Sequence, residues 1–414
     1  MRSFLSIFIL FIFFSPSIGI ATESMIHVKR NRAFIRKGPG SFYEVIATVH
    51  KGAALHCSEG MGHWLKVRFQ EKIGFISEKV TREAAPYKDV FSQMVIRPAD
   101  LRLSRHGMAA GAKGFAMRFA SRINGNTKLI DQLSAYRLNP AAYSSFKKTT
   151  FKNQNLAKRQ KQFPIPNLAV RNEFSMIEEG IGLGIASKIA ALKLYDNKNI
   201  ADYINFVGNL LVEATPAYDL QFKFFVIDQP FVNAYACPGG FIFITRGMLE
   251  LIKNEGELAA VLGHEIAHVV CQHGMQELEK RKPIIIAEDA FSRLDKELPH
   301  EKDDKFKKVE EDLDNLALDI YETIFYGRLS KYEREADRLG MVFAARCGYP
   351  PGLMANLLER MVRSRTVSTN EHYTREENKK RLDTIKSDLH ANRWKGNFNN
   401  FQERWQTVMT INSE

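Results

Sequence analysis

The segment His264-Glu265-Ile266-Ala267-His268 constrains this chain more than any other feature of its 414 residues. On an α-helix, residues four apart lie on one face, so the imidazoles of His264 and His268 can reach a single metal ion. Glu265 lies about 100° around the helix, where its carboxylate can accept a proton from water at the ion instead of binding the ion itself. Two imidazoles and a carboxylate suit catalytic zinc, so the pattern predicts one zinc ion per chain.

The surroundings of this segment favour the same interpretation. Residues 251–270 have a continuous helical pattern, with an apolar stripe that includes Leu258, Leu262 and Ile266. Burying two histidines and a glutamate in such a stripe is costly unless they have a partner. The alternative, core histidines satisfied by hydrogen bonds, is the weaker interpretation.

The third ligand is expected on another helix. An extended HExxHxxGxxH motif would require glycine at position 271 and histidine at position 274, but the chain has Cys271 and Gly274. Sites with two histidines and one glutamate take the glutamate from elsewhere. In the segment 330–340, Glu333 and Asp337 are four apart and share a helical face, so we expect one as a ligand and the other as the hydrogen-bond partner of a histidine.

Together these motifs resemble a known family. HEIAH, followed by Glu-x-x-Ala-Asp at 333–337, is similar to the HtpX-like and CAAX-prenyl-endopeptidase-like zinc metallopeptidases, and most similar to their soluble, exported, BepA-like members. A third match is the Asn-Ala-aromatic stretch beginning at Asn233, with a Gly-Gly turn leading into a strand. The resemblance covers about residues 170–385. It implies a zinc metallopeptidase with the following site: zinc ligands His264, His268 and Glu333, general base Glu265, and supporting residues Asp337 and Asn233.

The resemblance implies two further candidates. Soluble relatives carry a His-Pro turn followed six residues later by Arg, and that His can approach the zinc. Here His372 lacks the proline and Arg381 follows nine residues later, so a surface histidine is an equal alternative. If the match holds, His372 would occupy or border the open zinc position, and Arg381 would help to bind the transition-state oxyanion.

Residues 1–21 have the pattern of a secretory signal peptide. Arg2 precedes an apolar run at 4–14, and the small residues Gly19 and Ala21 mark a cut after Ala21. A run of about eleven residues is short for a membrane span. We therefore expect an exported protein, periplasmic or extracellular, that is soluble once the peptide is removed.

Residues 24–84 are expected to form a separate all-β module. Short alternating strands are predicted around 31–36, 45–49, 53–56, 63–69 and 72–76, with glycine-rich turns between them. Their order resembles the bacterial SH3-like domain, which in exported proteins often binds cell-wall peptides or protein partners. A targeting spacer without a ligand is the alternative.

Residues 97–165 form a basic connector. From 97 to 162 there are fourteen Lys and Arg against two Asp, a net charge of +12. Such a segment can attract anionic membranes or wall polymers, although a solvated linker explains it equally well. Nucleic acid is not an expected partner of an exported protein. The stretch 147–162 is predicted to be the most flexible part.

The expected fold class is α+β, a mainly helical zincin-type domain at 170–385 with a small sheet, preceded by the SH3-like barrel. Helices are predicted at 173–194 and 200–213 and strands at 222–227 and 240–245. Residues 275–329 are either an exposed helical hairpin or a lid over the site. Residues 386–414 are expected to be a C-terminal extension.

Four cysteines leave the redox chemistry open. Cys57, Cys237, Cys271 and Cys347 allow three full pairings, and the sequence does not choose among them. Cys271 lies one turn beyond His268, about 5 Å further along the helix axis, so a buried thiol or a disulfide fits better than a zinc ligand.

These features together predict an exported zinc endopeptidase acting on unfolded or unassembled envelope proteins. Two other classes stay open. One is a wall-binding or chaperone-like protein, and the other is a zinc hydrolase of peptidoglycan crosslinks.

Overall fold

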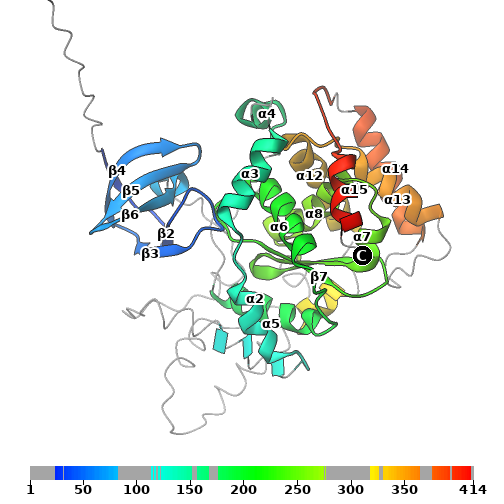
Figure 1. The fold of residues 1–414 in the computed structure, drawn as a ribbon, viewed down its shortest axis with the longest axis horizontal. Coiled ribbons are helices and arrows are strands. Elements are labelled where there is room, and N and C mark those ends of the chain that lie inside the picture. The colour runs from blue at the N-terminus through cyan, green and yellow to red at the C-terminus, as the bar shows by residue number, and fades with distance from the viewer. Residues whose placement is uncertain are drawn as a thin grey trace, which may run out of the picture.

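The computed structural model describes most of the chain and divides it into two units (Figure 1). Residues 1–21 and His372 lie outside the described residues, as does most of 275–329. No described helix is long and apolar enough to cross a membrane. The described residues are 24–30, 32–82, 123–151, 156–166, 176–274, 318–325, 330–363, 375–391 and 394–411, with Gln276 and several positions between 113 and 121.

The first unit is a six-stranded antiparallel sheet, drawn in blue in Figure 1. Its strands are β1 (Ser24–His27), β2 (Arg32–Arg36), β3 (Val45–His50), β4 (Ala54–Met61), β5 (Trp64–Phe69) and β6 (Lys72–Ser77), in the order β1-β4-β5-β6-β2-β3. Alternate residues point to opposite faces of a strand, so Ile35, Val67 and Ile76 meet in a separate small core. The prediction of a small all-β module is confirmed, with β1 as an additional strand.

The described part of the basic connector is largely helical. It contains α2 (Thr127–Ala135), α3 (Pro140–Thr150) and α4 (Leu156–Gln162). Asn126 and Asn139 accept hydrogen bonds from the first turns of α2 and α3, which is the usual role of asparagine at a helix start. Arg159 of α4 is buried and donates to the carbonyl of Ala345, 3.3 Å away. The prediction that residues 147–162 are flexible is therefore wrong for the described part, because α4 packs on the helical body.

The second unit is mainly helical, as predicted, with one small sheet. In the sheet, β9 lies between β7, to which it is parallel, and β8, to which it is antiparallel. The bounds are α5 (Met176–Ala190), α6 (Lys198–Glu213), β7 (Lys223–Ile227), β8 (Ala234–Cys237), β9 (Phe241–Thr245), α7 (Arg246–Leu251), α8 (Glu255–Val270), α12 (Ser330–Arg346), α13 (Leu353–Arg363), α14 (Arg375–Ala391) and α15 (Gln402–Ile411).

The helix that carries HEIAH starts later than its pattern predicts. Residue Ile252 is extended, and Asn254 begins α8 by accepting a hydrogen bond from the backbone of Glu257 at 3.0 Å. The Glu257 carboxylate accepts from the backbone of Lys253, the residue before the cap, at 2.8 Å, an arrangement close to a capping box. Every residue of α8 is buried, which explains why its apolar pattern is nearly continuous.

The predicted C-terminal extension belongs to this body. Helix α14 continues across position 386, and α15 packs against α6 and α8. The indole of Trp405 is buried and donates to the carbonyl of Ile252 at 3.3 Å. The guanidinium of Arg404 pairs with Glu255 in the first turn of α8. The end of the chain thus anchors the start of the HEIAH helix.

The two units meet through buried polar contacts. Asp219 of the helical body receives Arg30 at 3.0 Å and Lys79 at 2.7 Å, both from the β unit. Beside it, the Tyr218 hydroxyl lies 2.9 Å from that of Ser77. Because Asp219 and its two partners are largely buried, this carboxylate compensates two cations that would otherwise be desolvated without a counter-charge.

Asp219→Asn should therefore loosen the junction. Removing one partner of a buried ion pair costs about 3 to 5 kcal/mol, so we expect a lower unfolding temperature and faster proteolysis between the units. Calorimetry and limited trypsin digestion measure both. Asp196→Asn, at an exposed position, is the control, and equal behaviour of the two variants would contradict the role of Asp219.

Candidate metal centre

Two glycines bring the predicted ligand helices together. A Cβ atom on Gly263 of α8 would lie 3.2 Å from the carbonyl oxygen of Gly340 on α12. A Cβ on Gly340 would lie 2.9 Å from the backbone nitrogen of His264. A Cβ would be tight at Gly263 and would force a shift at Gly340, so the helices cross with their backbones in contact. Glu333 is seven residues before Gly340, which is about two helical turns on the same face, and the crossing therefore presents it to α8.

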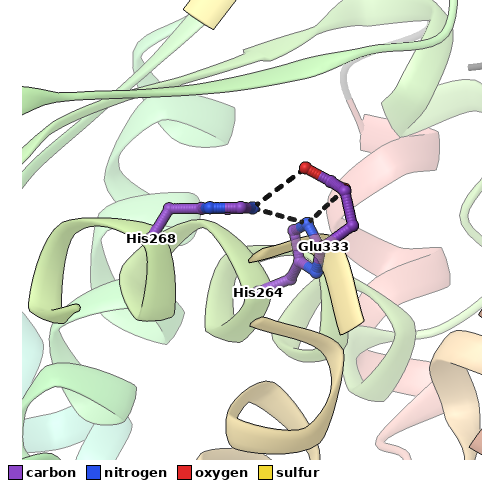
Figure 2. Close-up of side chains that lie close together, drawn as sticks. All are labelled: His264, His268 and Glu333. Atoms are coloured by element: carbon purple, nitrogen blue, oxygen red, sulfur yellow. Dashed lines mark hydrogen bonds and ion pairs between the residues drawn. The ribbon is translucent and has the colours of Figure 1, made fainter. Parts of the chain in front are cut away.

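The three predicted ligand side chains converge (Figure 2). The Nε2 atoms of His264 and His268 are 3.1 Å apart. The carboxylate of Glu333 lies 3.3 Å from the first of these nitrogens and 3.4 Å from the second. All three side chains are buried, and their ligand atoms lie within 4.8 Å of one another. Helix α8 supplies both imidazoles from one face, and α12 supplies the carboxylate from the other side.

The donor set fits a metal ion of the zinc class. The two Nε2 atoms are 3.1 Å apart, so at most one proton can lie between them. Both nitrogens also face the carboxylate of Glu333. Within the described residues, the buried oxygens of Glu333 receive no hydrogen bond of good geometry. Two nitrogens and one carboxylate oxygen, with room for a further ligand, match the usual donors of catalytic zinc.

Asp337 and Arg381 support these ligands from behind. The Nδ1 atom of His264 lies 2.8 Å from Asp337, which leaves Nε2 directed at Glu333 and His268. The guanidinium of Arg381 binds both oxygens of Asp337, at 2.8 and 2.7 Å, and lies 3.2 Å from Glu333. A carboxylate behind a ligating histidine fixes the tautomer and orientation of the ring. The structure thus brings Arg381 to the site from α14, which spacing alone does not predict.

The charges of this cluster stabilise one another. Burial alone would lower the pKa of His264, but Asp337 and Glu333 outweigh it and raise this pKa to about 9. Burial would also raise the pKa of Glu333, yet His268, His264 and Arg381 hold it well below its usual range. Ionised carboxylates facing imidazoles in a buried site favour positive charge at their centre.

Glu265 and Asn233 line a small cavity beside the cluster. The cavity has a volume of about 40 Å³ and is also lined by His264 and Arg381. Its remaining walls are mainly apolar side chains, from Val232, Ala234, Met248, Val261, Met354, Leu357, Leu358 and Met361. Glu265 lines this space and is not one of the three converging side chains, as its position on the helix predicts.

A family model places this part of the chain among known proteins. Residues 201–389 match the model described as "Peptidase family M48". This segment resembles the M48 peptidases and is called the M48 domain. It contains the three converging side chains together with Glu265 and Arg381.

Several curated proteins are similar over the same domain. The chain is 32% identical over 163 residues to a putative beta-barrel assembly-enhancing protease of Vibrio cholerae, covering 39% of this chain and 32% of that protein. It is 29% identical over 160 residues to the mitochondrial metalloendopeptidase OMA1 of Schizosaccharomyces pombe, covering 38% and 43%. For the beta-barrel assembly-enhancing protease of Escherichia coli K12 the identity is 27% over 175 residues, covering 41% and 34%. The matched region spans less than half the length of each of these relatives.

Sequence reasoning missed His273 in the M48 domain. Its Nδ1 atom lies 2.8 Å from Nδ1 of His268, and its Nε2 atom lies 3.3 Å from the carboxylate of Glu335. The ring is fully buried and stacks on Tyr332, with 4.7 Å between ring centroids. An extended HExxHxxGxxH motif would place its third histidine at position 274, so His273 stands one residue short of it. The available signal was its position five residues after His268, which places it just beyond the end of α8 at Val270.

All four cysteines are free thiols. Burial raises the pKa of Cys271 to about 12, so this thiol stays protonated at neutral pH. Of the alternatives left open by the sequence, the structure therefore has the buried thiol. Cys271 also lies with His273 and Glu335 in a second group of possible ligand atoms within 4.8 Å of one another.

Gly340→Ala tests the helix crossing. The added methyl group would push α12 away from α8 and move Glu333 off the histidines, at a cost of about 1 to 3 kcal/mol for overpacking. We expect weaker zinc binding, measured by chelator competition, together with a lower unfolding temperature. Ala344→Gly, on the same helix, should lower stability without affecting zinc. Unchanged zinc affinity in Gly340→Ala would show that the close contact does not position Glu333.

Proposed function

We propose that this chain is an exported zinc-dependent endopeptidase in which His264, His268 and Glu333 bind one zinc ion and Glu265 is the general base. The observation that carries the proposal is the convergence of these three buried ligand side chains, with Glu265 lining a cavity next to them. The resemblance of the matched segment to peptidase family M48 supports the same reaction class.

Each residue around the proposed zinc ion has a separate role in the proposed reaction. A bound zinc ion would supply the Lewis acidity that polarises the scissile carbonyl. Glu265 would accept a proton from the attacking water and deliver it to the leaving amine. Arg381, through Asp337, would hold the ring of His264 in its ligating orientation. Arg381 also lines the cavity of Glu265, which is compatible with the predicted role of Arg381 in binding the oxyanion. The role of His372 stays a prediction as well.

The substrate is proposed to bind as an extended strand. In the described part of the chain, β8 lies at one edge of the three-stranded sheet and pairs with β9. This strand packs directly against α8. An added strand would run past the metal centre, with an apolar side chain in the cavity of Met248 and Leu357. Only an unfolded segment can pair in this way, which favours unfolded or unassembled proteins as substrates.

Envelope proteins are the proposed source of such segments. The signal-peptide pattern of residues 1–21 supports export, and two of the relatives are named beta-barrel assembly-enhancing proteases. The six-stranded unit is proposed to be SH3-like on the order of its motifs, with contact to cell wall or anionic membranes as its function. The two alternative classes, a chaperone-like wall binder and a peptidoglycan hydrolase, have no observation in their favour beyond those patterns.

Glu265→Gln tests the proposed reaction. Losing the general base should lower turnover of an unfolded protein such as casein by on the order of 10² or more. Zinc content and unfolding temperature should stay close to those of the parent chain, because Glu265 is not among the grouped ligand side chains. Digestion of casein and of purified cell wall should be measured in parallel. Turnover of wall alone would move the function to the hydrolase class, and full casein turnover by the variant would remove Glu265 from the mechanism.

His273 is proposed to position His268. For Nε2 of His268 to bind a metal, its Nδ1 must carry the proton, which it would donate to Nδ1 of His273 at 2.8 Å. His273 would then be protonated at Nε2, where Glu335 accepts at 3.3 Å. Glu335 is 44% exposed at its side chain, so this chain of contacts runs from the buried ligand to solvent. It supports His268 as Asp337 supports His264.

The variant His273→Phe distinguishes the contribution of the His273 hydrogen bonds from that of its packing. Phenylalanine can keep the stack on Tyr332 while removing both ring nitrogens, so zinc affinity should fall by about 10- to 100-fold with little loss of stability. Glu335→Gln keeps an acceptor for His273 and should have a smaller effect. Chelator competition and thermal unfolding give the two readouts. Parental zinc affinity in His273→Phe would leave His273 with a packing role only.

A further inference from the structure

The junction between the two units encloses a cavity that peptide hydrolysis does not use. Its volume is about 390 Å³, and its walls come from β2 on one side and from α5, β7 and β9 on the other. Cavities of this size at domain boundaries are typical small-molecule sites. Most of its lining is apolar, and Phe34, Trp64, Leu183 and Phe241 contribute large side chains.

Cations from both units face this cavity. In β2 and the residues just before it, alternate positions carry Arg30, Arg32, Phe34 and Arg36, all of which line the cavity. Residues two apart share a strand face, so this row of arginines lies opposite the core residues of the β unit. The guanidinium groups of Arg32 and Arg36 lie 5.1 and 5.6 Å from the ring centre of Phe34.

Lys223 approaches from the helical body. It begins β7 and lies beside Phe241, the first residue of the neighbouring strand β9. Its ammonium group donates to the carbonyls of Leu133 and Ser134, at 2.9 and 2.7 Å. Lys223 is buried, with 8% of its surface exposed to solvent.

Two of these cations lack an anionic partner. Arg30 pairs with Asp219 at 3.0 Å and Arg32 with Glu179 at 3.2 Å. Arg36 has only 4% exposure and donates to the carbonyl of Tyr43 at 3.0 Å. Among the residues that the structure describes, neither Arg36 nor Lys223 has a carboxylate within ion-pair distance.

A buried cation without a counter-charge is unfavourable. Burial lowers the pKa of Arg36 to about 10 and that of Lys223 to about 7, because desolvation penalises the charged form. The carboxylates of Glu179 and Asp219, which also line the cavity, offset this only in part. Proteins generally pair buried charges with an opposite charge or a bound ligand. An anion in the cavity would supply the missing partner for both groups.

We propose that the cavity binds a small organic anion, with its carboxylate or phosphate group held by Arg36 and Lys223 and its apolar part against Phe34 and Phe241. A guanidinium and an ammonium group together recognise an oxyanion by charge-assisted hydrogen bonds. The predominantly apolar walls exclude a fully hydrated ion and require an apolar body on the ligand. Since the cavity has walls from both units, a ligand there would also tie the β unit to the M48 domain.

Binding can be measured without relying on hydrolysis. The full chain with Glu265→Gln is titrated calorimetrically at low salt with phenylacetate, phenyl phosphate, phenylacetamide and inorganic phosphate. We expect one or both of the aromatic anions to bind, and the neutral amide and inorganic phosphate to bind far more weakly. The stronger of the two aromatic anions identifies the acidic group. Failure of both to bind, or equal affinity for phenylacetamide, would overturn the proposal.

Variants locate the site. Lys223→Met and Arg36→Met should each weaken the binding of the aromatic anion on the order of tenfold or more, since each removes a buried charged partner. Lys193→Met, at a side chain that is 75% exposed and away from the cavity, should bind like the parent. Lys223→Met should also raise the unfolding temperature of the ligand-free chain, because it removes an uncompensated buried charge. Parental affinity in both cavity variants would place the ligand elsewhere and overturn the assignment.

Discussion

Helices α8 and α12 touch backbone to backbone at Gly263 and Gly340, and the geometry of the metal centre follows from this contact. Helices normally pack 8 to 10 Å apart, with the distance set by the side chains between them. Removing both side chains at the crossing lets the carboxylate of Glu333 approach two imidazoles closely. Larger residues at the crossing would separate the same ligands even if every one of them were retained.

The charged groups around this crossing are buried together and satisfy one another. The first turn of α8 is anchored by Glu255, which contacts Tyr203, Tyr349 and Arg404. The later part of the helix carries His264, whose ring is held by the pair of Asp337 and Arg381. Each of these groups would be costly to bury alone. As connected networks they fix the rotation of α8 and therefore the direction of its histidines.

The β unit is also held to the helical body by buried ion pairs. Its cations meet Asp219 and Glu179 of the helical body, which stabilises the docking of a module with its own core. Arg36 and Lys223 form no ion pair with these two carboxylates. The largely apolar cavity at the junction is therefore lined by two cations without an ion-pair partner among the described residues. The two proposed sites therefore differ in charge preference, with a cation in the M48 domain and an anion between the units.

Local spacing in the sequence predicted the ligand helix, the β strands and the pair of Glu333 and Asp337 as candidates for the third ligand and its support, because each depends on neighbours within a few residues. It could not determine contacts between distant segments. The partners Arg381 and His273, the ordered packing of the basic connector and the cavity at Lys223 arise only where separate elements meet. Helical periodicity states which residues share a face, whereas tertiary packing decides what that face meets.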